Sequence, residues 1–571
     1  MKIRIADFKG EIPRRSARLL PDNVATISSN ARLDDGNIIP YRGSDLVHTF
    51  DAAAQDFYKH NDEWLSFNAF INAAPGPVAQ DRLYYTRENG APRVLMGGSD
   101  YPLAVPTPAD SPTVALVGTL IDDLAQTVLY AYTFVTEFDE ESAPSPLSSP
   151  LLWSAGTTVD LSSMTAAPAG RGIDRRRIYR SQTSASGITD LYFVAEIPAT
   201  QTTYSHDPEA NPLQEVLSSA NYDPPVDTLQ GLTSLPNGMM AAFSGKRLFF
   251  CEPFIPHAWP DKYSLTVDYD IVALAAFGST LAILTKGTPY VAQGSAPENM
   301  VMERMEINLP CIAARGVVDL GYAAAYPSNE GLVVITATGA QLASRNLFTR
   351  DDWLDLSPST FFAARYDGRY AFGFVDGNID NVVGGDPALD PAPANAFDGG
   401  NPTSAILGYV NYDGGDPFTS DAINAIGFID LTGEQPHFLR TNPEDTGSPD
   451  QLFRDPLSGE MFLLTNGTEV LKFDARNQRT SAYKWRSKLF MAASPVSFSA
   501  VLVETNTTEA ETVLKTRVYA DGKLVRETDH FDRYQRLPGG FRAKEWQVEV
   551  EGNAEVTSIA LGETLDELAV P

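Results

Sequence analysis

The residues best placed for metal chemistry in this 571-residue chain lie in one acidic stretch. Residues 376–380 read D-G-N-I-D, the spacing that opens an EF-hand calcium loop. The sixth position of such a loop needs glycine and the twelfth needs a bidentate glutamate, but here they are Asn381 and Pro387. The EF-hand ligand set is therefore incomplete, and a surface calcium site on these carboxylates stays open as an alternative.

Other residue types capable of catalysis or ligation are scattered. The two cysteines, Cys251 and Cys311, lie in apolar surroundings, which predicts buried thiols and neither a disulfide framework nor a zinc site. No H-E-x-x-H pair, G-x-S-x-G elbow or phosphate-binding glycine loop is present. His257, in the run P-H-A-W-P, is expected to pack beside Trp259. These observations predict a protein that is not an enzyme and needs no cofactor or metal.

Charge is the strongest compositional signal. With 73 acidic and 43 basic residues the net charge is −30, which opposes tight binding to nucleic acid phosphates. Residues 371–450 hold thirteen acids and one base, Arg440, whereas the first twenty residues hold six bases and two acids. On composition alone, the acids can also be read as a solvated surface that resists aggregation. The R-R-R run at 175–177 is expected to face solvent or to pair with acids.

The elements that carry these charged residues are predicted from short apolar runs that end in turns. Runs such as I-V-A-L-A-A-F at 271–277, bounded by glycine, proline and aspartate, predict strands. The Asp521-Gly522 pair predicts a tight hairpin, and 565–569 a single helical turn. No apolar run approaches 18 residues, and the start M-K-I-R-I-A-D-F-K-G lacks the apolar core of a signal peptide. We therefore expect synthesis in a cytoplasm and no membrane insertion.

The rhythm of strands predicts an all-β fold with several domains, since the chain is too long for one core. We predict an irregular β-propeller with an inserted fibronectin type III-like β-sandwich and a small C-terminal β-sandwich. The predicted ranges are 1–105 (N-terminal strands of the propeller), 106–226 (the inserted sandwich), 227–484 (the main propeller) and 485–571 (the C-terminal sandwich).

Three stretches resemble a known family. They are R-x-x-x-F-K-G-x-x-P-R from Arg4, F-x-P-H-A-W-P-x-x-Y from Phe254 with the following I-V-A-L-A-A-F-G, and A-D-G followed by R-L-P-G-G-F-x-A-K-x-W from Ala520 to Trp546. Together they are similar to the tail nozzle proteins of tailed phages, also called tail tubular protein B. The resemblance implies a homo-hexamer around the DNA exit channel of the virion tail, docked below the adaptor ring and assembled in the host cytoplasm.

Combined with that resemblance, the charge pattern suggests two sites. DNA would pass through the channel without specific binding, because an acidic wall forms no lysine or arginine contacts to phosphate. Tail fibres are a further candidate partner. The candidate lumen or gate acids are Asp376, Asp380, Asp386, Asp390, Asp413, Asp416 and Asp421. The candidate adaptor contact consists of Lys2, Arg4, Lys9, Arg14 and Arg15.

Three alternatives remain open. The chain could be a receptor-binding or capsule-degrading tail protein that uses the inserted sandwich on host glycans, or a tail-tip or baseplate scaffold of different ring symmetry. It could also be a bacterial propeller that binds a small partner as a monomer. Six subunits coaxial with an adaptor would favour the nozzle, and three would favour a spike or tip.

Overall fold

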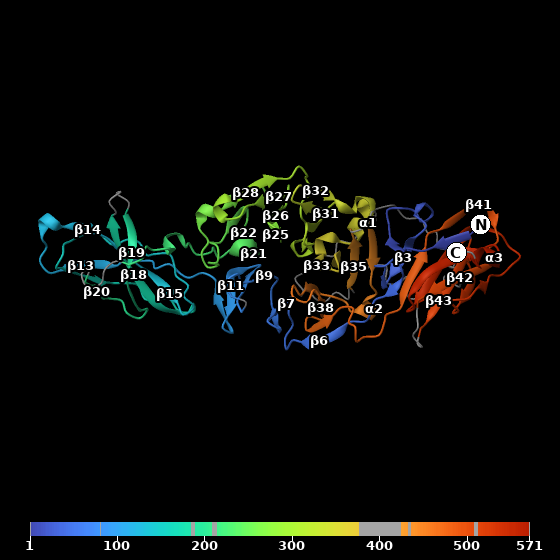
Figure 1. The fold of residues 1–571 in the computed structure, drawn as a ribbon, viewed down its shortest axis with the longest axis horizontal. Coiled ribbons are helices and arrows are strands. Elements are labelled where there is room, and N and C mark those ends of the chain that lie inside the picture. The colour runs from blue at the N-terminus through green and yellow to red at the C-terminus, as the bar shows by residue number, and fades with distance from the viewer. Residues whose placement is uncertain are drawn as a thin grey trace, which may run out of the picture.

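The protein is built from β-strands and is elongated (Figure 1). The computed structural model describes residues 2–79, 81–183, 189–207, 214–375, 424–431, 436–506 and 512–569. Within these ranges the α-helices are short: α1 (Arg350–Asp355), α2 (Pro443–Thr446) and α3 (Leu565–Ala569). The all-β prediction is confirmed, and α3 is the helical turn expected at 565–569.

The centre of the molecule consists of six four-stranded antiparallel units, of which five are separate sheets and one opens a larger sheet. In chain order, the first three are β9 (Ile71–Pro75), β10 (Leu83–Arg87), β11 (Gly90–Met96) and β12 (Ser99–Pro102); β21 (Gln230–Ser234), β22 (Met240–Ser244), β23 (Arg247–Phe250) and β24 (Leu265–Thr266); and β25 (Ile271–Phe277), β26 (Thr280–Thr285), β27 (Tyr290–Gln293) and β28 (Val301–Arg304).

The remaining three units complete the set. They are β29 (Val318–Asp319), β30 (Ala324–Ser328), β31 (Gly331–Thr336) and β32 (Gly339–Leu342); β33 (Phe362–Tyr366), β34 (Arg369–Val375), β35 (Asn424–Asp430) and β36 (His437–Arg440); and β37 (Gln451–Arg454), β38 (Met461–Thr465), β39 (Glu469–Lys472) and β6 (Asp45–Thr49). The last unit takes its outer strand, β6, from near the start of the chain.

The six units form a ring. Their first strands contact one another in the order β9, β21, β25, β29, β33 and β37. The hairpin of β7 (Asp56–His60) and β8 (Glu63–Phe67) lies between β37 and β9 and closes the cycle. We call these six units and the hairpin the six-sheet ring. The cyclic contacts are those expected of a propeller, which remains our interpretation of this region.

Apolar side chains fill the space between neighbouring units of the ring. In β25, Ile271, Ala273, Ala275 and Phe277 occupy buried positions that alternate with half-buried ones along the strand. Its side chains contribute to two separate cores, one against β21–β24 and the other against β30 and β31. Because each sheet is covered on both faces, its strands carry apolar residues on both faces, and strict alternation is lost in strands such as β26.

An inserted module leaves the ring after β12 and lies at one end of the molecule (Figure 1). It contains one sheet of β13 (Thr113–Val117), β17 (Thr158–Ser162) and β20 (Tyr204–His206), another of β15 (Tyr130–Thr136), β18 (Ile173–Thr183) and β19 (Thr189–Pro198), and the pair β14 (Gln126–Val128) and β16 (Leu151–Trp153). Tyr130, Tyr132 and Phe134 fill the core between them. The fibronectin type III-like topology remains a prediction.

A serine repeat holds the segment that follows β15. The backbone N–H groups of Phe134, Tyr132 and Tyr130 donate to the hydroxyls of Ser142, Ser145 and Ser148, respectively, at 3.0–3.1 Å. Every third residue of the serine segment therefore accepts from every second residue of β15. These contacts hold the segment E-S-A-P-S-P-L-S beside β15, although the segment is not a regular strand.

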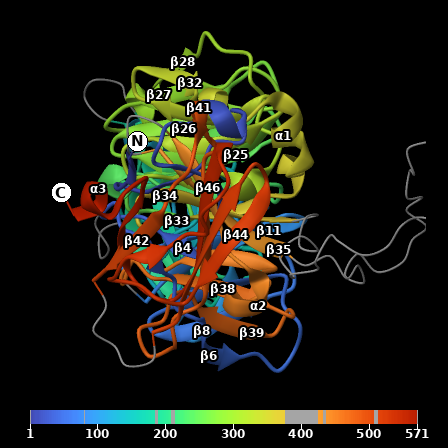
Figure 2. The same ribbon diagram turned by 90° about the vertical axis from the view of Figure 1, so that its right-hand side faces the viewer.

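The opposite end of the molecule, which we call the terminal lobe, contains both chain ends (Figure 2). One sheet contains β1 (Lys2–Ile5), β47 (Val556–Gly562), β42 (Ala500–Thr505) and β45 (Gln535–Arg536). The other continues the β33–β36 unit through β2 (Lys9–Glu11), β3 (Val24–Ser29), β40 (Tyr483–Ser487), β46 (Ala543–Gly552), β43 (Leu514–Ala520) and β44 (Lys523–Thr528), with β41 (Phe490–Val496) also on β46 and the small pair β4 (Ala31–Arg32) and β5 (Ile39–Pro40) nearby.

Strand pairing divides the predicted N-terminal range 1–105 between two regions. The strands β1 and β3 pair with C-terminal strands, whereas β6 and β9 belong to the ring. The lobe core packs Phe8 edge-on to Trp485 at 4.9 Å and Phe498 edge-on to Trp546 at 4.8 Å. The domain boundaries themselves stay predictions, and the expected Asp521-Gly522 hairpin joins β43 to β44.

Gly552, at the end of β46, provides a test of the terminal lobe. Its φ of +154° is rarely adopted by other residues, and a Cβ there would fall on the backbone oxygen of Val513. We expect Gly552→Ala to cost roughly 1–3 kcal/mol from backbone strain alone. Hydrogen–deuterium exchange of β43 and β46 should show the loss of protection. The control is Gly539→Ala, whose Cβ would meet nothing within 4 Å; equal protection in the two variants would contradict the prediction.

Candidate functional site

The seven candidate lumen acids, Asp376 to Asp421, lie outside the described residues, so their prediction stays untested. Four other acids of the 371–450 cluster are described, and the carboxylates of three of them form contacts within the chain. Asp430 pairs with Arg369 at 2.9 Å, Asp445 accepts from Asn30 at 2.7 Å, and Asp450 accepts from the N–H of Gly467 at 2.9 Å. The carboxylates of these three acids therefore have partners within the chain.

The five candidate adaptor residues all lie in the terminal lobe, on different elements. Lys2 and Arg4 occupy β1, where they alternate with the buried Ile3 and Ile5 and point away from the lobe core. The strand β1 pairs with β47 on one side and is an edge of its sheet. Lys2 and Arg4 thus form one outward-facing basic pair at a sheet edge.

The other three bases occupy β2 and the loop after it. Lys9 pairs with Asp7 at 3.1 Å. Arg14 donates from Nη1 to the carbonyl oxygen of Phe348 at 3.1 Å, which connects the lobe to the ring. Arg15 is exposed. The structure therefore separates the predicted contact into the β1 pair and a group near the ring.

A buried ionic cluster joins the module to the ring, and sequence reasoning missed it. Glu140 of the module accepts from Arg171 at 2.6 Å and from Arg82 of the ring at 3.2 Å. His257 lies 3.9 Å from the same carboxylate. We call Arg82, Glu140, Arg171 and His257 the junction cluster. Because a carboxylate is almost never buried unless paired, this cluster specifies how the module meets the ring.

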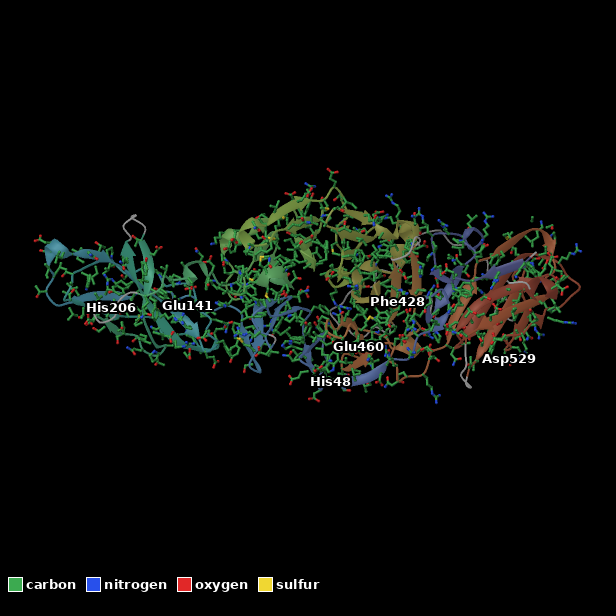
Figure 3. All side chains as sticks on the ribbon, in the orientation of Figure 1. His48, Glu141, His206, Phe428, Glu460 and Asp529 are labelled. Carbon is green, nitrogen blue, oxygen red and sulfur yellow. The ribbon has the colours of Figure 1, made fainter. Side chains whose placement is uncertain are left out.

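The next residue, Glu141, extends the junction into the module (Figure 3). Its carboxylate accepts from Thr133 at 2.7 Å, from Tyr179 at 2.6 Å and from Arg177 at 3.0 Å. Its backbone oxygen lies 3.1 Å from Nε2 of His257, which donates in the matching tautomer. Burial and the Glu141 carboxylate raise the pKa of the Tyr179 hydroxyl, so it remains a donor.

The two runs that meet here, D-E-E-S-A-P-S and F-I-P-H-A-W-P, are both visible in the sequence. The sequence features that could have indicated this contact are two adjacent glutamates before a serine repeat and a histidine between prolines. His257 is buried, with Tyr222 edge-on at 6.0 Å, and its expected packing beside Trp259 stays a prediction. Arg175 and Arg177 of the R-R-R run pair with acids as expected, while Arg176 is buried and donates to the carbonyl oxygens of Thr165 and Ala199.

Cys251 and Cys311 are free and buried, and burial raises the pKa of each thiol to about 12, so neither is a thiolate at neutral pH. Across the ranges that the structure describes, no group of three or more His, Cys, Asp or Glu side chains could hold a metal ion. The predicted loop at 376–380 lies outside those ranges.

Comparison with known proteins adds little. No protein-family model matches the chain. No curated protein is significantly similar to it. Among solved structures, the chain is 10% identical to the extracellular domain assigned to a hybrid two-component system of B. thetaiotaomicron, covering 94% of this chain and 78% of that one with a TM-score of 0.21. This similarity is too low to support an argument about fold or function.

Among the described residues, no helix is both long enough and apolar enough to span a membrane.

The junction cluster yields a paired prediction. We expect Glu140→Gln to leave the buried guanidinium of Arg171 and the half-buried one of Arg82 without their carboxylate, at a cost of about 3–5 kcal/mol. The neighbouring change Asp139→Asn removes an exposed ion pair with Arg175 and should leave the stability nearly unchanged. Thermal denaturation and limited proteolysis between module and ring would compare the two variants. Equal stability of both would show that the buried cluster does not hold the junction.

His257 makes the junction sensitive to pH. Burial lowers the pKa of its imidazole, against the opposing effect of Glu140. Since the unfolded side chain titrates near pH 6.5, its contribution to stability is complete above about that pH and is lost as the pH falls. We expect the melting temperature of the wild type to drop more steeply between about pH 7 and 5 than that of His257→Gln. If the melting temperatures of the two proteins fell equally with pH, the pH sensitivity would not come from His257.

Proposed function

We propose that this chain is a structural subunit of a phage tail, forming a hexameric nozzle ring around the DNA exit channel below the adaptor. The observation that supports this proposal best is the linear order of the molecule. Module, ring and terminal lobe follow one another along the long axis, with both chain ends in the lobe (Figure 1). Such a subunit can span a tail segment, with one end for the adaptor and the other pointing away from it.

In this proposal, the six-sheet ring is the rigid scaffold of the subunit. We interpret it as an irregular six-bladed propeller into which the module is inserted between the first two blades. Sheets packed on both faces and closed by β6 make a rigid body that transmits load between its ends. The proposed function requires rigidity and shape, and it requires no catalytic group.

Charge supports the passage of DNA. Six copies at −30 each would surround the channel with negative potential, which opposes the phosphate contacts that slow a moving duplex. Several arginines are also buried inside the fold, among them Arg171, Arg176 and Arg369. Because Arg171 and Arg369 pair there with the buried acids Glu140 and Asp430, their burial leaves the acidic excess of the accessible surface unchanged.

A second function, receptor binding or a tail-tip or baseplate role, is favoured by one surface of the module. Ile121, Leu124 and Leu152 are 48%, 62% and 52% exposed near the β14–β16 pair. Figure 1 places β14 at the end of the molecule remote from the ring. Aliphatic side chains of this kind suit contact with a protein better than with a glycan, which aromatic rings would bind.

Electron cryo-microscopy of assembled tails would test the proposal. We expect six copies coaxial with the adaptor, with the terminal lobe at the adaptor side. Three copies at the tail tip would support the second function, and a monomer outside the particle would exclude both. Purified protein should also show no tight binding to duplex DNA at about 0.15 M salt, where phosphate contacts still contribute affinity.

The β1 pair gives a test of the adaptor contact. We expect the double variant Lys2→Glu, Arg4→Glu to weaken binding to the adaptor roughly tenfold at physiological salt, mainly through slower association. The control is Lys523→Glu, Arg526→Glu, which makes the same charge change on exposed positions of β44 in the same lobe. Surface plasmon resonance would measure both. Unchanged binding of the β1 variant, or equal weakening by the control, would contradict a contact at β1.

A further inference from the structure

A cavity lies where the first strands of the ring converge. Residues of β7, β9, β21, β25, β33 and β37 line it, together with the segment that precedes β29. Its volume of about 760 Å³ falls within the range of small-molecule sites. We call it the axial cavity.

Arg315 is the central cation of the axial cavity. Its guanidinium lies 3.7 Å from the ring centre of Phe70 and 5.2 Å from that of Phe362. Its Nη2 donates to the side-chain oxygen of Gln451 at 2.6 Å and to the carbonyl oxygen of Asp450 at 3.2 Å. Aromatic stacking and two neutral acceptors fix the group in place without neutralising its charge.

The nearest acid is already satisfied. Both oxygens of the buried Asp56 carboxylate accept hydrogen bonds: from the N–H of Phe57 at 2.9 Å, from Gln451 at 3.2 Å and from the N–H of Ile71 at 2.9 Å. Within the described ranges, no carboxylate lies within ion-pair distance of Arg315. Burial lowers the pKa of Arg315 to about 10 and raises that of Asp56, so the arginine stays charged at neutral pH.

A second guanidinium, that of Arg87, also lines the cavity. Nε of Arg87 and Nε of Arg315 are both buried, and neither has a hydrogen-bond partner. Lys286 lines the cavity as well, paired at 3.7 Å with Asp270, and the exposed Glu88 is the opposing charge. In a chain of net charge −30, this cavity combines three cations with one satisfied acid and one exposed acid.

We propose that the axial cavity binds a small oxyanion, a carboxylate or a phosphate, between the guanidinium groups of Arg87 and Arg315. Two arginine forks match the paired oxygens of such anions and give charge-assisted hydrogen bonds. Apolar residues on the same wall, including Val272 and Phe361, suit a short apolar body attached to the anionic group. The site depends on the ring alone and not on hexamer formation or passage of DNA.

Isothermal titration of the full chain with inorganic phosphate and with succinate, each against sodium chloride of equal ionic strength, would test the site. At about 20 mM ionic strength, where screening is weak, we expect saturable binding at one site per chain. Binding of phosphate alone, of succinate alone, or of both identifies the source of the oxyanion and supports the site. No saturable binding of either probe overturns the proposal.

Variants give the second arm of the test. Arg87→Gln should weaken binding at least tenfold while the melting temperature without ligand stays unchanged. Arg315→Lys keeps the charge but removes the fork and should weaken binding as well. The control is Arg304→Gln, which removes an arginine on the outer strand β28, paired there with Asp268 at 3.3 Å. Full affinity in Arg87→Gln, or equal weakening by Arg304→Gln, overturns the proposal.

Discussion

Closure of the six-sheet ring is the constraint on which the rest of the molecule depends. The ring closes only when β6 pairs with β39, joining residues 45–49 to 469–472. Those two segments are separated in sequence by most of the chain, so the loop-closure entropy is lost before the contacts form. Closure holds the hairpin β7–β8 against β9 and β37, and so shapes the axial cavity. It also provides the platform from which the module projects.

Several arginines form ion pairs at the boundaries between the regions of this fold. Arg171 and Arg82 join the module to the ring, and Arg440 pairs with the buried Glu11 where the ring sheet continues into the lobe. The Arg82–Glu140 and Arg440–Glu11 pairs each cross a boundary between regions, where a charge must find its partner in one geometry. The module, the ring and the lobe are thus connected by directional contacts in addition to apolar packing, and the acids left over produce the negative surface.

The sequence predicted local structure well where one signal dominated. The strand β25 has the predicted bounds because I-V-A-L-A-A-F is enclosed by turn residues, and Asp521-Gly522 fixed its hairpin through two positive φ values. Contacts between distant segments could not be predicted. Nothing local in K-I-R-I shows that β1 pairs with residues near the other end, and Glu140 gives no sign of its partner Arg82. Arg315, a lone charge in the apolar run C-I-A-A-R-G-V-V, was the one available signal for the axial cavity.

During synthesis, β1 has no partner strand until the ribosome has translated β47. At about 5–20 residues per second, the ribosome takes roughly half a minute to two minutes to reach the partner strand. Throughout that interval the first segment is a nascent edge able to pair with other chains. Lys2 and Arg4, alternating with isoleucines, give that edge the charges that discourage such pairing. Lys2 and Arg4 therefore disfavour strand pairing between nascent chains during the time before β47 has been synthesised.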